Sequence, residues 1–323
     1  MIIDQKKIKM WSTIGSRATF GMALLEISKK VENLIVLSSD VSTSAGLDRF
    51  RKMHPEKYVE LGISEQNMIG VATGLSAENF NVVTTTFAPF QTIRCCEQIK
   101  INLGYMEHKV TLVGLASGLA LGNLGYTHCC IEDIGILRTI PNITILSPAD
   151  SLETVKCLES SLKTNQSVYI RLTGTANNPI IYKDDYNFKI GKAITLKEGS
   201  DITIFSTGRM VYNSLKAAEI LADKKISARV INVHTIKPVD KAAIEEANDT
   251  KMIFSVEEHN IIGGLGSAIA EHQSSLKTNV RFIRLGIKDK YGSGGSYDYL
   301  QKIHGLSSEK IVENILKNYQ ENE

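Results

Sequence analysis

The sequence lacks the cysteine patterns that stabilise a secreted fold or bind a metal. Its five cysteines are Cys95–Cys96, Cys129–Cys130 and Cys157. Neighbouring cysteines seldom form a disulfide, and neither a Cys-x-x-Cys nor a Cys/His metal spacing occurs. We therefore expect reduced thiols in a cytoplasmic protein and no metal ligands in this chain.

Long apolar runs are also missing. The longest, from Val110 to Leu124, is too short to cross a bilayer and is interrupted by three glycines. The opening residues MIIDQKKIKMWSTIGSR include basic side chains but no apolar segment behind them, so no secretory signal is expected. The 37 basic and 35 acidic residues are interspersed and give a net charge of +2. This balance argues against a nucleic-acid or membrane-binding surface.

Apolar segments of strand length alternate with segments of helical periodicity along the 323 residues. In the first half, strands are predicted at Leu34–Ser38, Val82–Thr86, Val110–Gly114, Ile143–Leu146 and Val168–Leu172. Helices are predicted at Glu65–Glu78, at Asp150–Lys163 with Asp150 or Ser151 as N-cap, and from near Ser12 or Thr13 onward. Strands without polar alternation, separated by helices, indicate a parallel sheet covered on both faces.

The alternation of strand and helix segments is interrupted between Thr173 and Ser200, where Asn, Pro, Asp and Gly accumulate. It resumes with strands at Ile202–Ser206, Ala228–Val233, Met252–Val256 and Arg281–Leu285, and helices near Val211–Lys224, Lys241–Asn248, Gly266–Ser275 and Ser308–Asn318. A chain of this length is expected to form two domains. We predict an α/β protein with two parallel-sheet domains, residues 1–175 and 201–323, joined by a linker at 176–200.

Three places in the first domain have side chains that suit a binding site. Glu65 begins a predicted helix, Phe87 and Phe90 follow a predicted strand, and His128 ends the Gly-rich loop GNLGYTH. A first-turn carboxylate, a core aromatic pair and a surface histidine are the ordinary explanations of these residues. All three places lie at or just beyond the carboxyl ends of predicted parallel strands, where open α/β sheets bind ligands.

Two other features are weaker. The residues GGLG at 263–266 precede a helix but have neither the full dinucleotide-binding pattern nor a Walker lysine, so we interpret them as a tight turn. Cys129 beside His128 would need a side-chain geometry that sequence neighbours rarely reach. A Cys–His nucleophile is therefore not expected.

Several segments, taken in order, resemble the C-terminal part of the transketolase family over nearly the whole chain. They are LSSDVSTSAGLDRF, ELGISEQNMIGVATGLS, TTTFAPF, YTHCCIEDIGILRTIPNITILSPAD and SVEEHNIIGGLGSAIAEH. Each segment is weak alone, and their order and spacing make the combination specific. The resemblance implies a pyrimidine-binding domain for thiamine diphosphate, followed by the C-terminal domain of the family.

The resemblance also implies roles for the candidate residues. Glu65 matches a carboxyl group that bonds a nitrogen of the aminopyrimidine ring; such a group favours the imino form of the ring and should occupy a desolvated slot. Phe87 and Phe90 match residues that pack on this ring. His128 matches a histidine that faces the reacting carbons and is suited to moving protons on substrate oxygens.

Two further matches lie beside the cofactor. Val41 matches an apolar side chain under the bent cofactor, and Asp40 matches an acidic position near it, although a plain strand-end carboxylate is the ordinary explanation of Asp40. The GDG motif and downstream Asn of the diphosphate-binding domain do not occur, and we expect no room for that domain before Ser12. The resemblance therefore implies a partner chain that holds the diphosphate and Mg²⁺, a homodimer through the first domain, and a two-plus-two assembly.

The substrate side departs from the family. Ala116 stands where a histidine is common, Asn123-Leu124 replaces an acidic pair, and Gly174 replaces a phosphate-gripping arginine, with Arg171 three residues earlier. Buried sugar hydroxyls need polar partners and a phosphate needs a fixed cation. We therefore expect an atypical substrate that is unphosphorylated, deoxygenated or anchored elsewhere.

Together these observations predict a transketolase-like transferase that moves a two-carbon ketol unit between sugars or sugar derivatives. Two alternatives stay open. One is decarboxylation of a 2-oxo acid by an enzyme resembling deoxyxylulose-phosphate synthase or a dehydrogenase beta subunit, and the other is a catalytically silent scaffold subunit. The joint presence of Glu65, Phe87, Phe90 and His128 argues against a silent subunit, because stability alone does not require an acid beside an apolar slot.

Overall fold

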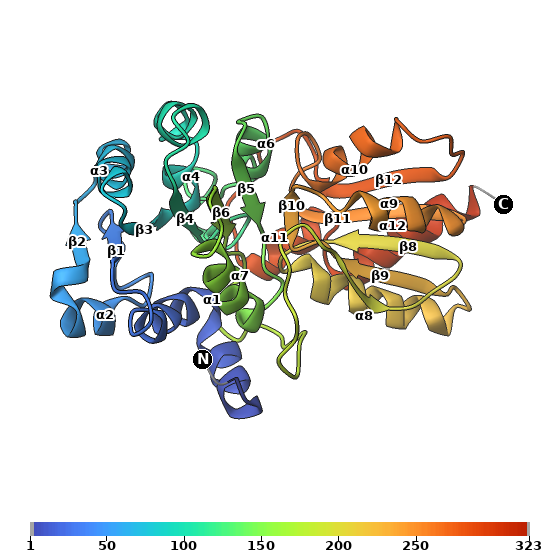
Figure 1. Cartoon of the computed structure of the whole chain (residues 1–323). Coiled ribbons are helices and arrows are strands. Elements are labelled where there is room, and N and C mark those ends of the chain that lie inside the picture. Colours follow the sequence, from blue (N-terminus) through green and yellow to red (C-terminus); the bar gives the residue numbers. More distant parts are fainter. Residues whose placement is uncertain (1–2, 322–323) are drawn as a thin grey trace.

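The computed structural model describes residues 3–321 and contains two β-sheets that lie side by side (Figure 1). The larger sheet has the strand order β10-β5-β6-β4-β3-β1-β2, and the smaller has the order β12-β11-β8-β9-β7. The strands are β1 (Leu34–Ser38), β2 (Tyr58–Glu60), β3 (Asn81–Phe87), β4 (Val110–Leu115), β5 (Ile143–Leu146), β6 (Ser167–Arg171), β7 (Ile194–Lys197), β8 (Ile202–Ser206), β9 (Ala228–Asn232), β10 (Thr235–Lys237), β11 (Met252–Asn260) and β12 (Arg281–Ile287).

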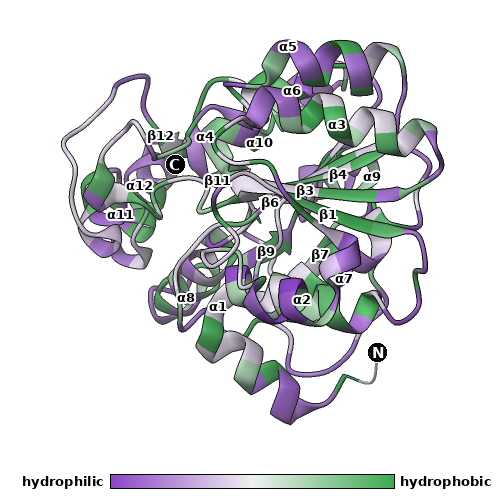
Figure 2. Ribbon diagram, turned by 90° about the vertical axis from the view of Figure 1, so that its left-hand side faces the viewer, coloured by the Kyte–Doolittle hydropathy of each residue, from purple (hydrophilic) through white to green (hydrophobic). Residues whose placement is uncertain are grey.

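Helices cover both sheets. They are α1 (Gln5–Ile27), α2 (Asp48–Met53), α3 (Glu65–Ala77), α4 (Ala88–Gln91), α5 (Cys96–Gln98), α6 (Asp133–Arg138), α7 (Ser151–Ser161), α8 (Met210–Asp223), α9 (Lys241–Glu246), α10 (Leu265–Gln273), α11 (Tyr297–Ile303) and α12 (Ser308–Gln320). Short 3₁₀ turns η1 (Pro55–Lys57), η3 (Gly122–Leu124) and η4 (Ala247–Asp249) and the π-helical η2 (Ile99–Tyr105) join them. The apolar strands lie inside and the polar helix faces point outward (Figure 2).

The predicted fold class is confirmed, because nearly all neighbouring strands are parallel. Among the described strands, only β10 against β5 and β7 against β9 are antiparallel. The central strands β4, β6 and β8 are buried along their whole length, as expected for strands covered on both faces. The strand β7 lies within the segment 176–200 that the sequence suggested as a linker.

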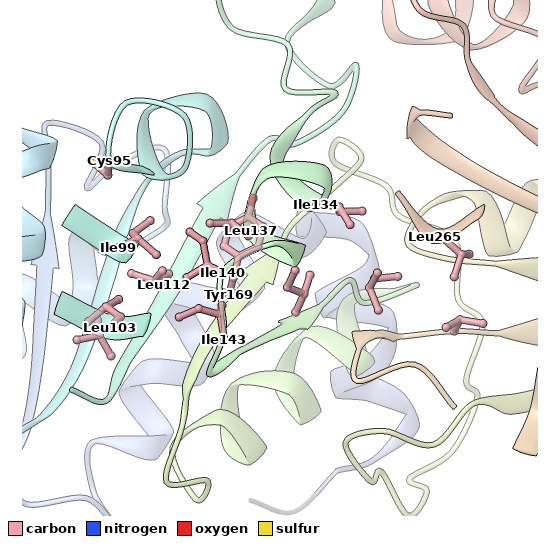
Figure 3. Close-up of a cluster of buried hydrophobic side chains, with 14 of the residues drawn as sticks. Cys95, Ile99, Leu103, Leu112, Ile134, Leu137, Ile140, Ile143, Tyr169 and Leu265 are labelled. Carbon is pink, nitrogen blue, oxygen red and sulfur yellow. The ribbon is translucent and has the colours of Figure 1, made fainter. Parts of the chain in front are cut away.

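One hydrophobic core runs through both halves of the chain. It includes Leu112 of β4, Ile134 and Leu137 of α6, and Leu265 of α10, all fully buried (Figure 3). The strand β10 belongs to the second half of the sequence and yet completes the sheet of the first half. The two halves of the chain are therefore joined by a shared core and by this strand exchange.

The helix expected from near Ser12 begins earlier, so that prediction was wrong at its start. The side chain of Asp4 caps α1 by accepting a hydrogen bond from the backbone of Lys7. The helix is broken at Gly15, which has a φ of 79°. A Cβ atom there would lie 2.7 Å from the carbonyl oxygen of Thr175, so this close approach requires glycine.

Membrane-spanning helices and clustered metal ligands are both absent from the described residues. No helix between residues 3 and 321 is both long and apolar enough to cross a membrane. Within the same range, no group of three His, Cys, Asp or Glu side chains is arranged to hold a metal ion.

Candidate active site

Glu65 is a buried carboxylate at the start of a helix. It is the first residue of α3, and its side chain is only 4% exposed. Its Oε1 accepts a hydrogen bond of 2.7 Å from Nη1 of Arg94. No hydrogen bond to Oε2 occurs within residues 3–321. The preceding residue, Ser64, does not cap the helix with its side chain, because its hydroxyl donates to the carbonyl of Leu61.

Three rings meet at the carboxyl end of β3. The rings of Phe87 and Phe90 lie 6.4 Å apart in an edge-to-face arrangement. The ring of His128 lies 6.4 Å from Phe87 and 5.4 Å from Phe90, again edge-on to both. Edge-to-face contacts at these distances are favourable and leave ring faces available. The structure therefore brings together three of the residues that the sequence analysis selected from segments far apart along the chain.

Local chain geometry places these rings. Phe87 ends β3, and Ala88 and Pro89 begin the short helix α4, so the chain turns sharply between the two phenylalanines. His128 belongs to the loop after η3, which is pinned by a backbone bridge between Gly118 and Cys130. The Nδ1 atom of His128 lies 3.0 Å from the hydroxyl of Thr127. This contact orients the imidazole beside the aromatic pair.

Arg94 joins the cluster and was not selected from the sequence. Its guanidinium carbon lies 4.0 Å from the centre of the Phe90 ring while Nη1 holds Glu65. A cavity of about 540 Å³ lies elsewhere, whereas one of about 390 Å³ adjoins this cluster and is lined by Phe90, Arg94, Tyr126, Glu132 and Tyr291 among others. The only sequence signal for Arg94 is a cation seven residues after Phe87, which by itself predicts no contact with Glu65.

Asp40 and Val41 follow β1 on the same edge of the sheet. Val41 is buried, whereas the Asp40 side chain is exposed and makes no hydrogen bond among the described residues. The carboxylate of Glu60 holds this edge together by accepting three hydrogen bonds. The donors are the backbone N–H of Asp40 at 2.8 Å, the backbone N–H of Gly62 at 3.1 Å and the hydroxyl of Tyr58 at 2.6 Å. Burial acts to raise the pKa of Glu60, but these hydrogen bonds outweigh it and the pKa is lowered.

A second pocket, of about 280 Å³, lies where α1 is broken. Its lining includes Arg17, Thr43, Ser44 and Gly174. Arg17 is half-buried, its side chain has no hydrogen bond or ion pair within residues 3–321, and burial lowers its pKa. A partly desolvated guanidinium without an anion is costly. The pocket therefore has the electrostatic character of an anion site.

Arg171 cannot serve such a site. Its side chain is 1% exposed, and its Nε donates to both oxygens of Asp133 at 3.0 and 2.8 Å. Its Nη2 donates to the carbonyls of Cys130 and Glu258. Arg171 therefore connects the loop that carries His128 to the second sheet.

The weaker features have structural explanations. Glu257 accepts hydrogen bonds from the backbones of Leu265 and Gly266, so the N-terminus of α10 after GGLG is occupied by a carboxylate of this chain. Burial raises the pKa of the Cys129 thiol to about 11, which disfavours the thiolate. A Cys–His nucleophile is not formed, because His128 contacts Thr127 and the aromatic rings.

The cluster has the groups that an aminopyrimidine ring would require. Glu65 is a buried carboxylate with an unused oxygen, and Arg94 links it to the aromatic Phe90. The apolar Val41 follows β1 on the same sheet edge and is buried. The residues therefore fit the pyrimidine half of thiamine diphosphate, with Glu65 to bond the ring and the phenylalanines to pack on it.

Comparisons with known proteins cover both sheets. Residues 12–178 match the transketolase pyrimidine-binding domain, and residues 191–311 match the transketolase C-terminal domain. A subunit of the apulose-4-phosphate transketolase of Phocaeicola vulgatus is 36% identical over 94% of this chain and 97% of that protein. The 6-deoxy-6-sulfo-D-fructose transketolase subunit of a Clostridium species is 38% identical over 92% of each. A solved split gene transketolase, an inactive beta4 tetramer, superposes with a TM-score of 0.87 at 32% identity, over 94% of this chain and 98% of that one.

Proposed function

This chain belongs to the transketolase family, and we propose that it is the pyrimidine-binding subunit of a split transferase that moves a two-carbon ketol unit between sugars. The family implies dependence on thiamine diphosphate. Two relatives that this chain covers over 97% and 92% of their length are themselves named as transketolase subunits, which supports an enzyme completed by a partner chain. In this proposal the partner holds the diphosphate and Mg²⁺.

The observation that carries the proposal is the burial of Glu65, whose partner Arg94 lies on the ring of Phe90 in the cluster with Phe87 and His128. Thiamine diphosphate supplies a nucleophilic thiazolium carbon when it is bound. Glu65 shares a proton with the pyrimidine ring, and the two phenylalanines pack on that ring and exclude water. His128, held by Thr127, moves protons on the ketol oxygens of the substrate.

Substitution of Glu65 by Gln tests this assignment, since it preserves shape and removes the shared proton. In the complex reconstituted with the partner, exchange of the thiazolium proton should slow by about 10²–10⁴-fold, the usual size of an acid–base contribution. Glu97→Gln is the matched control, because Glu97 is an exposed acid on the nearby helix α5. Equal exchange rates in the two variants would identify Glu65 as a helix-start carboxylate and the chain as a scaffold.

We also propose that the substrate has an anionic end that binds at Arg17. The pocket beside Gly174 supplies a cation from α1 where the sequence analysis found none after β6. One relative is named for a sugar phosphate and another for a sulfonated sugar, and both groups are anions. Guanidinium binds phosphate and sulfonate oxygens through charge-assisted hydrogen bonds. This proposal replaces the expectation of an unphosphorylated substrate, whereas Ala116 and Leu124 still favour a substrate with fewer hydroxyls.

Assembly is the third part of the proposal. The outer face of α3 carries Gly70 and Gly74, both exposed, and a Cβ atom at either would meet nothing within 4 Å. Ile63, just before this helix, is 75% exposed. Small residues let two helices approach closely, so we propose that α3 packs against its copy in a homodimer through the first domain. The related split gene transketolase, solved as a beta4 tetramer, supports self-association of such subunits.

Gly70→Leu tests this contact without weakening the fold. Leucine is a good helix former, whereas glycine is about 0.8–1 kcal/mol less favourable than alanine in a helix, so the monomer should be no less stable. Light scattering of the purified chain should show a shift from dimer or tetramer toward monomer. The matched control is Ala242→Leu, which adds the same side chain at an exposed position of a different helix, α9, because residues 70, 74 and 77 of α3 share one face. An unchanged mass for Gly70→Leu would contradict the proposed interface.

A further inference from the structure

Arg94 makes the two contacts that the proposed function assigns to the aminopyrimidine ring of the cofactor. Its Nη1 donates to Glu65 at 2.7 Å, and its guanidinium lies over the face of Phe90 at 4.0 Å. A guanidinium is planar and delocalised and carries N–H donors at its edge. In these respects it resembles an aminopyrimidine, which also stacks on aromatic rings and bonds a carboxylate through its edge.

The two groups therefore overlap at the face of Phe90 and at Glu65, where Arg94 holds Oε1 and leaves only Oε2 unused. Oε1 of Glu65 is already engaged by Arg94, and the stacked guanidinium covers one face of Phe90. A pyrimidine ring that stacks on that face must displace the guanidinium. The side chain of Arg94 is 42% exposed, so its displacement does not require unfolding of the helices around it.

The displaced guanidinium has a second place to bind. Arg94 and Glu132 line the same cavity of about 390 Å³, together with Tyr126 and Tyr291. Oε1 of Glu132 accepts a hydrogen bond of 2.9 Å from the Tyr291 hydroxyl, which holds the carboxylate at the cavity wall. If Arg94 leaves Glu65, its guanidinium loses a negative partner. The Glu132 carboxylate in the wall of the same cavity can replace that partner.

We propose that Arg94 is a positioning residue. In the unliganded subunit its guanidinium occupies the binding position of the pyrimidine ring, and it moves toward Glu132 when the cofactor binds. This inference rests on the proposed function, because it needs a pyrimidine ring at Glu65. It predicts that Arg94 opposes cofactor binding and that Glu132 favours it. A purely structural ion pair between Arg94 and Glu65 predicts the reverse for Arg94, since its removal would disorder the site.

The test is titration of the purified chain with thiamine, which carries the pyrimidine ring but no diphosphate, followed by ligand-observed NMR. Arg94→Met should bind thiamine about 10-fold or more tightly than the native chain, because a charge-assisted hydrogen bond no longer competes. Arg94→Lys should fall between the two, since lysine keeps the charge but lacks the stacked plane. Glu132→Gln should bind more weakly than the native chain.

Arg281→Met is the matched control, because Arg281 is a similarly exposed arginine, 40%, whose ion pair with Glu321 lies on the surface. Circular dichroism of each variant checks that the fold is kept. Weaker, equal or undetectable thiamine binding by a folded Arg94→Met chain overturns the inference. Proton exchange in Glu65→Gln, measured in the assembled complex that retains Arg94, reports separately on the proposed function, so failure of one is distinguishable from failure of the other.

Discussion

The buried ion pair between Arg171 and Asp133 should be far more important for stability than a surface pair of the same chemistry. Asp133 is fully buried and accepts two hydrogen bonds from Arg171 and one of 2.7 Å from the Tyr169 hydroxyl. Asp133→Asn leaves a buried guanidinium without its counter-charge. Breaking such a pair by removing one partner costs about 3–5 kcal/mol of the free energy of unfolding. Because proteins are typically stable by about 5–15 kcal/mol, this is a large fraction of the total.

The chain contains a matched control for this experiment. Arg229 also holds an aspartate through two hydrogen bonds, of 2.9 and 2.8 Å, but this aspartate, Asp249, is 59% exposed. Asp249→Asn should therefore cost only about 0.2–1 kcal/mol, because water and salt screen a surface pair. The two variants have the same chemical change, and the sites differ in burial and in the hydrogen bond that Tyr169 donates to Asp133.

Urea titration of both variants at one fixed protein concentration measures the two costs, since self-association makes the apparent stability depend on concentration. The double variant Asp133→Leu with Arg171→Met should recover part of the loss, because apolar side chains remove the unpaired charge. Equal costs for Asp133→Asn and Asp249→Asn would refute the reasoning. Since Arg171 also binds the carbonyl of Cys130, Asp133→Asn should loosen the His128 loop and speed its hydrogen exchange.

Three further outcomes are expected. Gly15→Ala should lower the free energy of unfolding by about 1–3 kcal/mol in thermal or urea melts, because its φ of 79° is strained for alanine; a neutral effect would contradict the close approach of Thr175. Arg17→Gln should raise KM for an anionic sugar about 10-fold or more with little change in kcat, and leave an uncharged analogue unaffected in steady-state assays. Burial raises the pKa of Glu257 to about 7 from an ordinary 4.5, so its contribution to stability should fall by about 3 kcal/mol as pH rises from about 4.5 to about 7. In urea melts at several pH values, Glu257→Gln should lack this fall in the free energy of unfolding. A pH profile identical to that of the native chain would contradict the raised pKa of Glu257.

Local sequence was sufficient for most of the secondary structure. The strands β1, β5 and β8 have the predicted limits, because each is a short apolar run between polar residues. Asp150 caps α7 as predicted, since its side chain accepts a hydrogen bond from the backbone of Glu153. Parallel order follows from the alternation of strands and helices, and it places Glu65, Phe87 and His128 at one edge of a sheet.

Other features depend on contacts between distant segments. The three residues of β10 include a single apolar side chain, Ile236, and they form a strand because β5 offers an open edge. Arg94 contacts Glu65 only because α3 and the turn after β3 meet in space, and Arg17 lines a pocket only because α1 breaks against residues 174–176. The sequence by itself therefore determined the order of strands and helices and the family-type residues of the site. Tertiary structure alone decided that Arg94 pairs with Glu65 and that Arg17 lines a pocket, because charge pairing is set by distance in space and periodicity along the chain does not encode it.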